Sequence, residues 1–155
     1  MTTLTLQQNL IKTEIISNIR YENYENKNLP YGEWTNEPDK ITWFFPQHNL
    51  MAMIVRHPLL GHLCGYVGLP NNHPLYGVSI DDAPGYVHGH WTYADYCDDH
   101  ICHKALPDEP NKVYWLGFDC AHYNDLSPGL PYTQGTYKNI YYVANEIAQV
   151  LEELS

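Results

Sequence analysis

Short apolar runs fill the middle of the chain, and apolar residues recur with helical spacing towards both ends. The runs are rich in β-branched and aromatic residues and cover residues 41–45, 50–56, 63–69, 86–93 and 113–119. Proline, glycine, asparagine or aspartate separates each run from the next. This pattern predicts five β-strands joined by turns.

The last segment, residues 137–154, has the clearest helical pattern. Its apolar positions are Ile140, Val143, Ala144, Ile147, Leu151 and Leu154, which is the spacing of an amphipathic helix. Thr136 is placed to cap the start of this helix. Residues 4–19 carry a weaker stripe of the same kind, which predicts an N-terminal helix, and the polar residues 21–40 predict a connecting loop.

Several strands followed by one helix, without alternation of strands and helices, indicate the α+β class. We therefore expect a single mixed or antiparallel sheet with a packed C-terminal helix and an N-terminal helix. At 155 residues the chain has the length of one domain, so we expect residues 1–155 to form a single domain.

The charge of the chain excludes some partners. Eight Lys and Arg residues stand against eighteen Asp and Glu residues, which gives a formal net charge of −10, and no Lys or Arg lies between His57 and Lys104. Binding to a nucleic acid polymer depends on clustered basic residues, so neither such a polymer nor an anionic membrane is an expected partner. A small anionic ligand is compatible with this charge if backbone amides, protonated histidines or a metal ion meet it.

The cysteines and the N-terminal residues bear on the compartment. The first residues lack the features of a signal peptide, and no apolar run approaches the ~20 residues of a membrane helix. We therefore expect a cytoplasmic protein. In that compartment the four cysteines, Cys64, Cys97, Cys102 and Cys120, are expected to be reduced thiols or metal ligands.

Eight of the nine histidines lie between His57 and His122, and several belong to distinctive short strings. These strings are GHLCGYVGLP (61–70), NNHPLYG (71–77), VHGHWTY (87–93) and GFDCAHYNDLSPG (117–129). His62 and Cys64 are two residues apart on a predicted strand, so their side chains share a face. Such a concentration of histidine and cysteine makes this middle stretch the candidate site.

One hypothesis gives these residues acid–base chemistry around a pocket. His62, His88 and His122 would exchange protons with a ligand, because the ordinary pKa of histidine lies near neutral pH. Asp119 or Asp125 would orient one imidazole. The remaining candidate ligand-binding residues are Tyr66, His73, Thr92, Tyr93 and Trp115, which offer hydroxyl groups, an imidazole and rings for stacking.

Two other hypotheses are open. The segment CDDHICHK supplies zinc-ligand types in Cys97, His100, Cys102 and His103, although this spacing matches no standard zinc finger. Alternatively, the cysteines and histidines are structural, buried as small apolar groups or bonded to carbonyls. The chain has no G-x-S-x-G elbow, no P-loop and no dinucleotide-binding fingerprint.

Taken in order, seven strings resemble a family of small proteins found in bacteriophages and bacterial genomes. They are NEPDKITW (36–43), GHLCGYVGLP (61–70), HPLYG (73–77), VHGHWTY (87–93), ICH (101–103), WLGFDCAH (115–122) and YKNIYYVANEIAQVL (137–151). The resemblance implies a family core over residues 33–154 and a peripheral segment over residues 1–32. The family more often has His-Gly-Gly where this chain has His88-Gly89-His90, which favours His88 over His90 as a functional residue.

The resemblance implies a context, since some small phage proteins disarm host immunity by degrading or sequestering nucleotide signals. We therefore expect a phosphodiesterase-like hydrolase that acts on a nucleotide-like or other phosphate-bearing small molecule through histidine acid–base chemistry. The first alternative is a non-catalytic protein that binds and sequesters such a signal. The second is a zinc-stabilised module that binds a protein.

Overall fold

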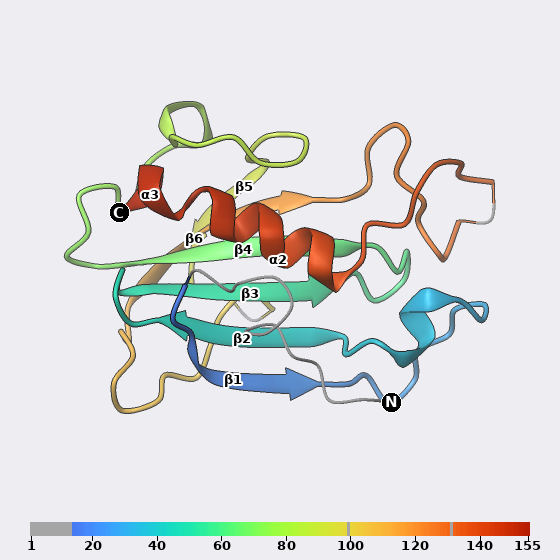
Figure 1. Cartoon of the computed structure of the whole chain (residues 1–155), viewed down its shortest axis with the longest axis horizontal. Helices are drawn as coiled ribbons and strands as arrows, with labels where there is room; N and C mark the ends of the chain where they lie inside the picture. Colours follow the sequence, from blue (N-terminus) through green and yellow to red (C-terminus); the bar gives the residue numbers. More distant parts are fainter. Residues whose placement is uncertain (1–13, 99, 131) are drawn as a thin grey trace.

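The computed structural model describes residues 14–98, 100–130 and 132–155 and contains one six-stranded sheet with a helix packed across it (Figure 1). The strands are β1 (Ser17–Glu22), β2 (Lys40–Phe45), β3 (Leu50–Arg56), β4 (Leu63–Pro70), β5 (Tyr93–Tyr96) and β6 (Val113–Asp119). They are arranged in the order β1-β2-β3-β4-β6-β5, and every neighbouring pair is antiparallel. The expected α+β class with a single sheet and a packed C-terminal helix is confirmed.

Alternation along the strands gives the sheet two different faces. One face carries the larger cluster of buried apolar side chains, which includes Ile41, Trp43, Ile54, Val67 and Leu116. The residues between them point to the opposite face, where a smaller apolar cluster forms around Met51, Met53, Tyr66 and Trp115. The strands therefore have a helix-covered face and an open face.

The helix-covered face is completed by α2 (Ile140–Gln149) and α3 (Leu151–Leu154). In Figure 1, α2 crosses in front of the central strands, and its contacts are with β3 and β4. Gly65 permits this approach, because a Cβ atom there would lie 2.8 Å from Val143. The predicted apolar stripe is confirmed, since its six positions are all buried: Ile140, Val143, Ala144, Ile147, Leu151 and Leu154.

The predicted start of this helix was wrong by three residues. The N-cap is Asn139 and not Thr136, because the Asn139 side chain accepts a hydrogen bond of 2.9 Å from the Tyr142 N–H. Thr136 instead forms an isolated bridge with Asp125, so the segment before the helix lies beside the chain that follows β6.

Two other predicted elements differ from the structure. The N-terminal helix was predicted over residues 4–19; residues 1–13 lie outside the described part, and Ser17–Glu22 is strand β1, paired with β2. The strand predicted over residues 86–93 is a loop until Tyr93, because Gly89 and His90 both have a φ of 68° and turn the chain.

The predicted loop over residues 21–40 contains only a short 3₁₀ helix, η1 (Glu33–Asn36), in its interior. A second short 3₁₀ helix, η2 (Ile80–Asp82), follows β4. No helix within the described ranges is long and apolar enough to cross a membrane.

Candidate active site on the open face

A row of cross-strand neighbours runs over five strands at one end of the open face. Strand register places Glu22 opposite Lys40, Lys40 opposite Val55, Val55 opposite Cys64 and Cys64 opposite Asp119. Residues paired across neighbouring strands point to the same side of the sheet. We call these five residues the cross-strand row.

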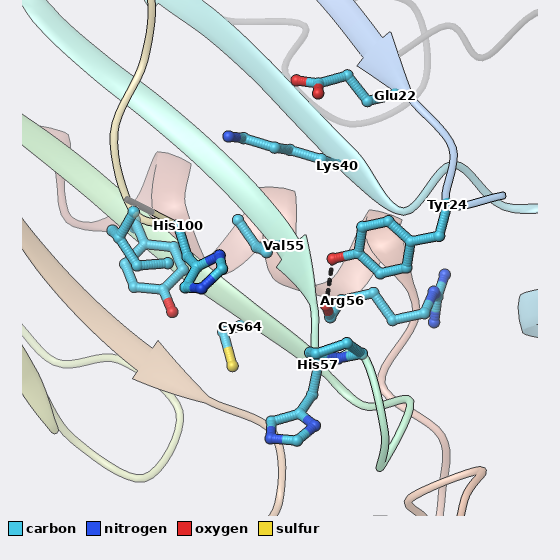
Figure 2. Close-up of a pocket in the computed structure, with 11 residues that line it drawn as sticks. Glu22, Tyr24, Lys40, Val55, Arg56, His57, Cys64 and His100 are labelled. Atoms are coloured by element: carbon cyan, nitrogen blue, oxygen red, sulfur yellow. Dashed lines mark hydrogen bonds between the residues drawn. The ribbon is translucent and has the colours of Figure 1, made fainter. Parts of the chain in front are cut away.

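A pocket of about 610 Å³ lies over the first four residues of this row. Its lining includes Lys40, Val55, His57, Cys64, Tyr66 and His100. In Figure 2 the Cys64 side chain lies between those of His57 and His100. The volume falls in the range of small-molecule sites. His57 Nδ1 accepts hydrogen bonds from the N–H groups of Leu59 and Leu60 at 3.2 and 3.0 Å, so the neutral ring carries its hydrogen on Nε2.

The last residue of the row, Asp119, contacts a histidine from the loop that follows β6. Asp119 Oδ1 lies 3.2 Å from His122 Nε2 and accepts a hydrogen bond of 3.1 Å from the Thr92 hydroxyl. The His122 Nε2 atom is buried and, within the described residues, makes no hydrogen bond, so its 3.2 Å contact with Asp119 is an ion pair only when the ring is protonated. The His122 side chain is 36% exposed, so a ligand can reach it.

A second imidazole–carboxylate pair lies beside the first. His88 Nε2 is 2.7 Å from Asp125 Oδ2, and His88 Nδ1 is 2.8 Å from the Tyr142 hydroxyl on α2. The ring centroids of His88 and His122 are 5.8 Å apart. Asp125 also accepts a hydrogen bond from the His122 N–H at 3.0 Å, so one buried carboxylate positions both histidines.

The charge state of Asp125 follows from its contacts. Burial by itself raises its pKa, but hydrogen bonds from the His122 N–H, His88 and Lys138 outweigh burial and lower the pKa below its usual value. Lys138 Nζ lies 3.0 Å from Asp125 Oδ1. The carboxylate is therefore ionised at neutral pH and holds a hydrogen on His88 Nε2.

His62 is a buried neighbour of this cluster and stays neutral. Burial first, and then the charge of His57, lower the pKa of His62 to about 4, against the opposing effects of Asp119 and Asp125. The His57 and His62 rings stack with centroids 5.0 Å apart. Within the part of the chain that the structure describes, the buried His62 Nδ1 has no hydrogen-bond partner.

The two cysteines of the central strings are poor nucleophiles. Burial raises the pKa of the Cys64 thiol to about 12, with Asp119 acting in the same direction. Burial likewise raises the pKa of the Cys120 thiol. Both thiols are therefore protonated at neutral pH, which leaves the histidines as the candidate acid–base groups of this site.

Other candidate residues lie elsewhere. His73 follows the far end of β4, accepts a hydrogen bond of 3.0 Å from the Leu75 N–H and bonds the Leu154 carbonyl at the end of α3, so it fastens a loop to the C-terminal helix. Trp115 is fully buried against the His103 ring. Tyr66 and Tyr93 pack edge to face, 5.5 Å apart, and of these two Tyr66 lines the pocket.

The predicted reduced state of all four cysteines was wrong. Cys97 and Cys102 form a disulfide, while Cys64 and Cys120 are free. A hydrogen bond from the Asp98 N–H to the Ile101 carbonyl closes this turn and brings the Cys97 and Cys102 Cα atoms to 4.8 Å, which suits a disulfide.

The candidate zinc ligands are separated by the same turn. His100 lines the pocket, whereas the His103 Nε2 bonds the Pro110 carbonyl at 3.0 Å. In the described residues, which exclude Asp99, no group of three or more His, Cys, Asp or Glu side chains is arranged to hold a metal ion.

Sequence reasoning missed Lys40, His57, Lys138 and Tyr142 as members of the site. Lys40 and His57 lie at the ends of predicted strands. Nothing else in the sequence indicates that they belong to the site. Lys138 and Tyr142 come from the start of the C-terminal helix, which is far in sequence from the histidines. Their approach depends on how the helix crosses the sheet.

No protein-family model, curated protein or solved structure matches this chain. The resemblance to small phage and bacterial proteins therefore stays a prediction, and the residues themselves carry the functional argument.

Proposed function

We propose that this protein is a small hydrolase that cleaves a phosphate ester in a nucleotide-like molecule by acid–base catalysis with His122 and His88. The observation that carries the proposal is the pair of imidazole–carboxylate contacts, His122 with Asp119 and His88 with Asp125, whose rings are 5.8 Å apart. Two histidines at this separation suit a reaction that needs a base and an acid on either side of one phosphorus atom.

In the proposed reaction, neutral His122 takes a proton from a water molecule through Nδ1 as the water oxygen attacks phosphorus. The bond between phosphorus and the leaving oxygen breaks, and protonated His88 gives its proton to that oxygen. Asp119 lies 3.2 Å from His122 Nε2 and Asp125 lies 2.7 Å from His88 Nε2, so each carboxylate would orient one of the two rings. The products are a phosphate and an alcohol; His122 then releases its proton to solvent and His88 takes one up from solvent, which restores both rings.

Tyr142 has a defined part in this scheme. Its hydroxyl occupies the His88 nitrogen that does not face Asp125, so the proton of His88 reaches the leaving oxygen either through the hydroxyl or after the tyrosine turns away. The Tyr142 side chain is 36% exposed, so the second route would need only a rotation of an already partly exposed ring.

The same contact favours a second candidate function, sequestration without cleavage. Both ring nitrogens of His88 are already hydrogen-bonded, so His88 can also be a purely structural part of a binding site. In that case the pocket and the exposed His122 would hold a nucleotide signal, and no bond would be broken.

The test is to incubate the purified protein with an excess of cyclic, linear and ADP-ribose-type nucleotides and to analyse the mixtures by mass spectrometry. A hydrolase converts many equivalents of one compound. A sequestering protein retains about one equivalent and releases it intact on heating. No conversion and no retention of any compound would contradict both functions.

We further propose that the protein acts in the cytoplasm, in a phage-infected host if the resemblance to phage proteins holds. There it would remove or withhold a nucleotide signal of host defence. The net charge of −10 supports a small-molecule ligand over a nucleic acid polymer.

A further inference from the structure

We infer that the cross-strand row is a substrate-binding track, and that Lys40 binds a second anionic group of the substrate, away from the bond that is cleaved. The inference rests on the proposed function and adds a substrate class to it, namely molecules of at least two linked nucleotide units with a terminal phosphate. A mononucleotide would fill only one end of the track.

The length of the track follows from the register of the sheet. Lys40, Val55, Cys64 and Asp119 occupy four neighbouring strands in one row. Strands lie about 4.8 Å apart, so the Cα atoms of Lys40 and Asp119 are separated by roughly 14 Å. The pocket covers the Lys40 end and reaches Cys64, the direct neighbour of Asp119, so the pocket and the acid–base pair adjoin.

The charges along the track differ at its two ends. The reactive end has Asp119 and His122, whereas the pocket has Lys40, His57 and His100. Arg56 also lines the pocket, but its guanidinium is buried and bonded to Asp39, Glu37 and Tyr137. Among the residues that the structure describes, Lys40 makes one long hydrogen bond of 3.3 Å, to the Cys102 carbonyl, so its ammonium group can bind an anion.

One carboxylate opposes this use of Lys40. Glu22 is its partner on the other side of the row and also lines the pocket. Glu22 is exposed to solvent, where water and salt weaken its attraction for the lysine. A phosphate that enters the pocket would carry more negative charge than Glu22 and would also face His57 and His100, which line the same pocket.

The experiment compares two dinucleotides that differ only in the terminal group, pApA and ApA. Binding is measured by calorimetry on the His122→Ala protein, so that neither probe is consumed. We expect pApA to bind at least about tenfold more tightly than ApA, and we expect Lys40→Met in the same background to remove that preference. Raising the salt concentration should shrink it, since exposed charges are screened.

Lys112→Met is the matched control, because Lys112 precedes β6 at the opposite end of the sheet, outside this pocket. Equal affinity for both probes, a preference that survives Lys40→Met, or no binding of either probe would overturn the inference. If the preference is found and no nucleotide is cleaved by the wild-type protein, the track stands and hydrolysis is wrong. If nucleotides are cleaved without any such preference, hydrolysis stands and the track is wrong.

Discussion

The two faces of the sheet are made by the same strands, yet they carry different kinds of residue. On the helix-covered face, apolar side chains from all the central strands meet α2 and are buried. On the open face, apolar packing is confined to one part, and the cross-strand row brings Lys40, Cys64 and Asp119 to the surface. One face therefore supplies most of the apolar core, and the other is free to bind a ligand.

This difference can be tested first on the helix-covered face. Leu151→Ala should lower the free energy of unfolding by about 2–5 kcal/mol, because it leaves a cavity between α3 and the sheet. Urea denaturation measures the change. Glu152→Ala, at the exposed neighbouring position, should change it by less than about 0.5 kcal/mol. Equal stability of the two variants would contradict the packing of this helix.

The pH dependence of stability tests the boundary of the site. The pKa of His62 is about 4 in the folded protein, against an ordinary histidine value of 6.5. Between these pH values the unfolded chain therefore binds a proton that the folded chain does not. The contribution of His62 to the free energy of unfolding should be fully present above pH 6.5 and be lost, by up to about 3 kcal/mol, as the pH drops towards 4. His62→Leu should lack this component in parallel urea titrations. Identical pH profiles for the two proteins would show that His62 is not buried in its neutral form.

The disulfide offers a smaller test, on the loop that forms one wall of the pocket. Cys97→Ser combined with Cys102→Ser should destabilise the protein by about 2 kcal/mol, the loop-entropy value for so short a ring. In the wild-type protein, thiol titration after denaturation without reductant should find two free thiols. Four free thiols would contradict the disulfide and restore the fully reduced state that the sequence predicted.

Much of the sheet could be predicted because apolar runs with clear turn residues at both ends leave little choice of structure. β3 and β6 begin and end at the predicted residues. The strand predicted over residues 86–93 failed because two consecutive left-handed residues, Gly89 and His90, interrupt an apolar pattern that looks continuous. The start of β1 was mistaken for helix because Ile15 and Ile19 have a spacing that fits either structure.

The site could be predicted in its residue types but not in its contacts. The strings around His88 and His122 were chosen for their composition. Nothing in them indicates that Asp125 would bind both the His88 ring and the His122 backbone N–H. The contact of Cys64 with Asp119 depends on β6 pairing with β4, and strand order is a long-range property. The contact between Tyr142 and His88 is also long-range, since the two residues are 54 positions apart in the sequence.

The central claim is that His122 is an exposed acid–base group that acts together with His88 beside the end of β6. The most direct test is to measure kcat/KM of His122→Ala with the nucleotide that the wild-type protein converts, together with its thermal midpoint. We expect kcat/KM to fall roughly 100- to 10,000-fold, with a thermal midpoint within a few degrees of the wild-type value. His90→Asn, which changes a histidine packed on Tyr86 outside the cluster, should leave kcat/KM within about threefold of the wild-type value. Unchanged activity of His122→Ala, or an equal loss in His90→Asn, would contradict the claim.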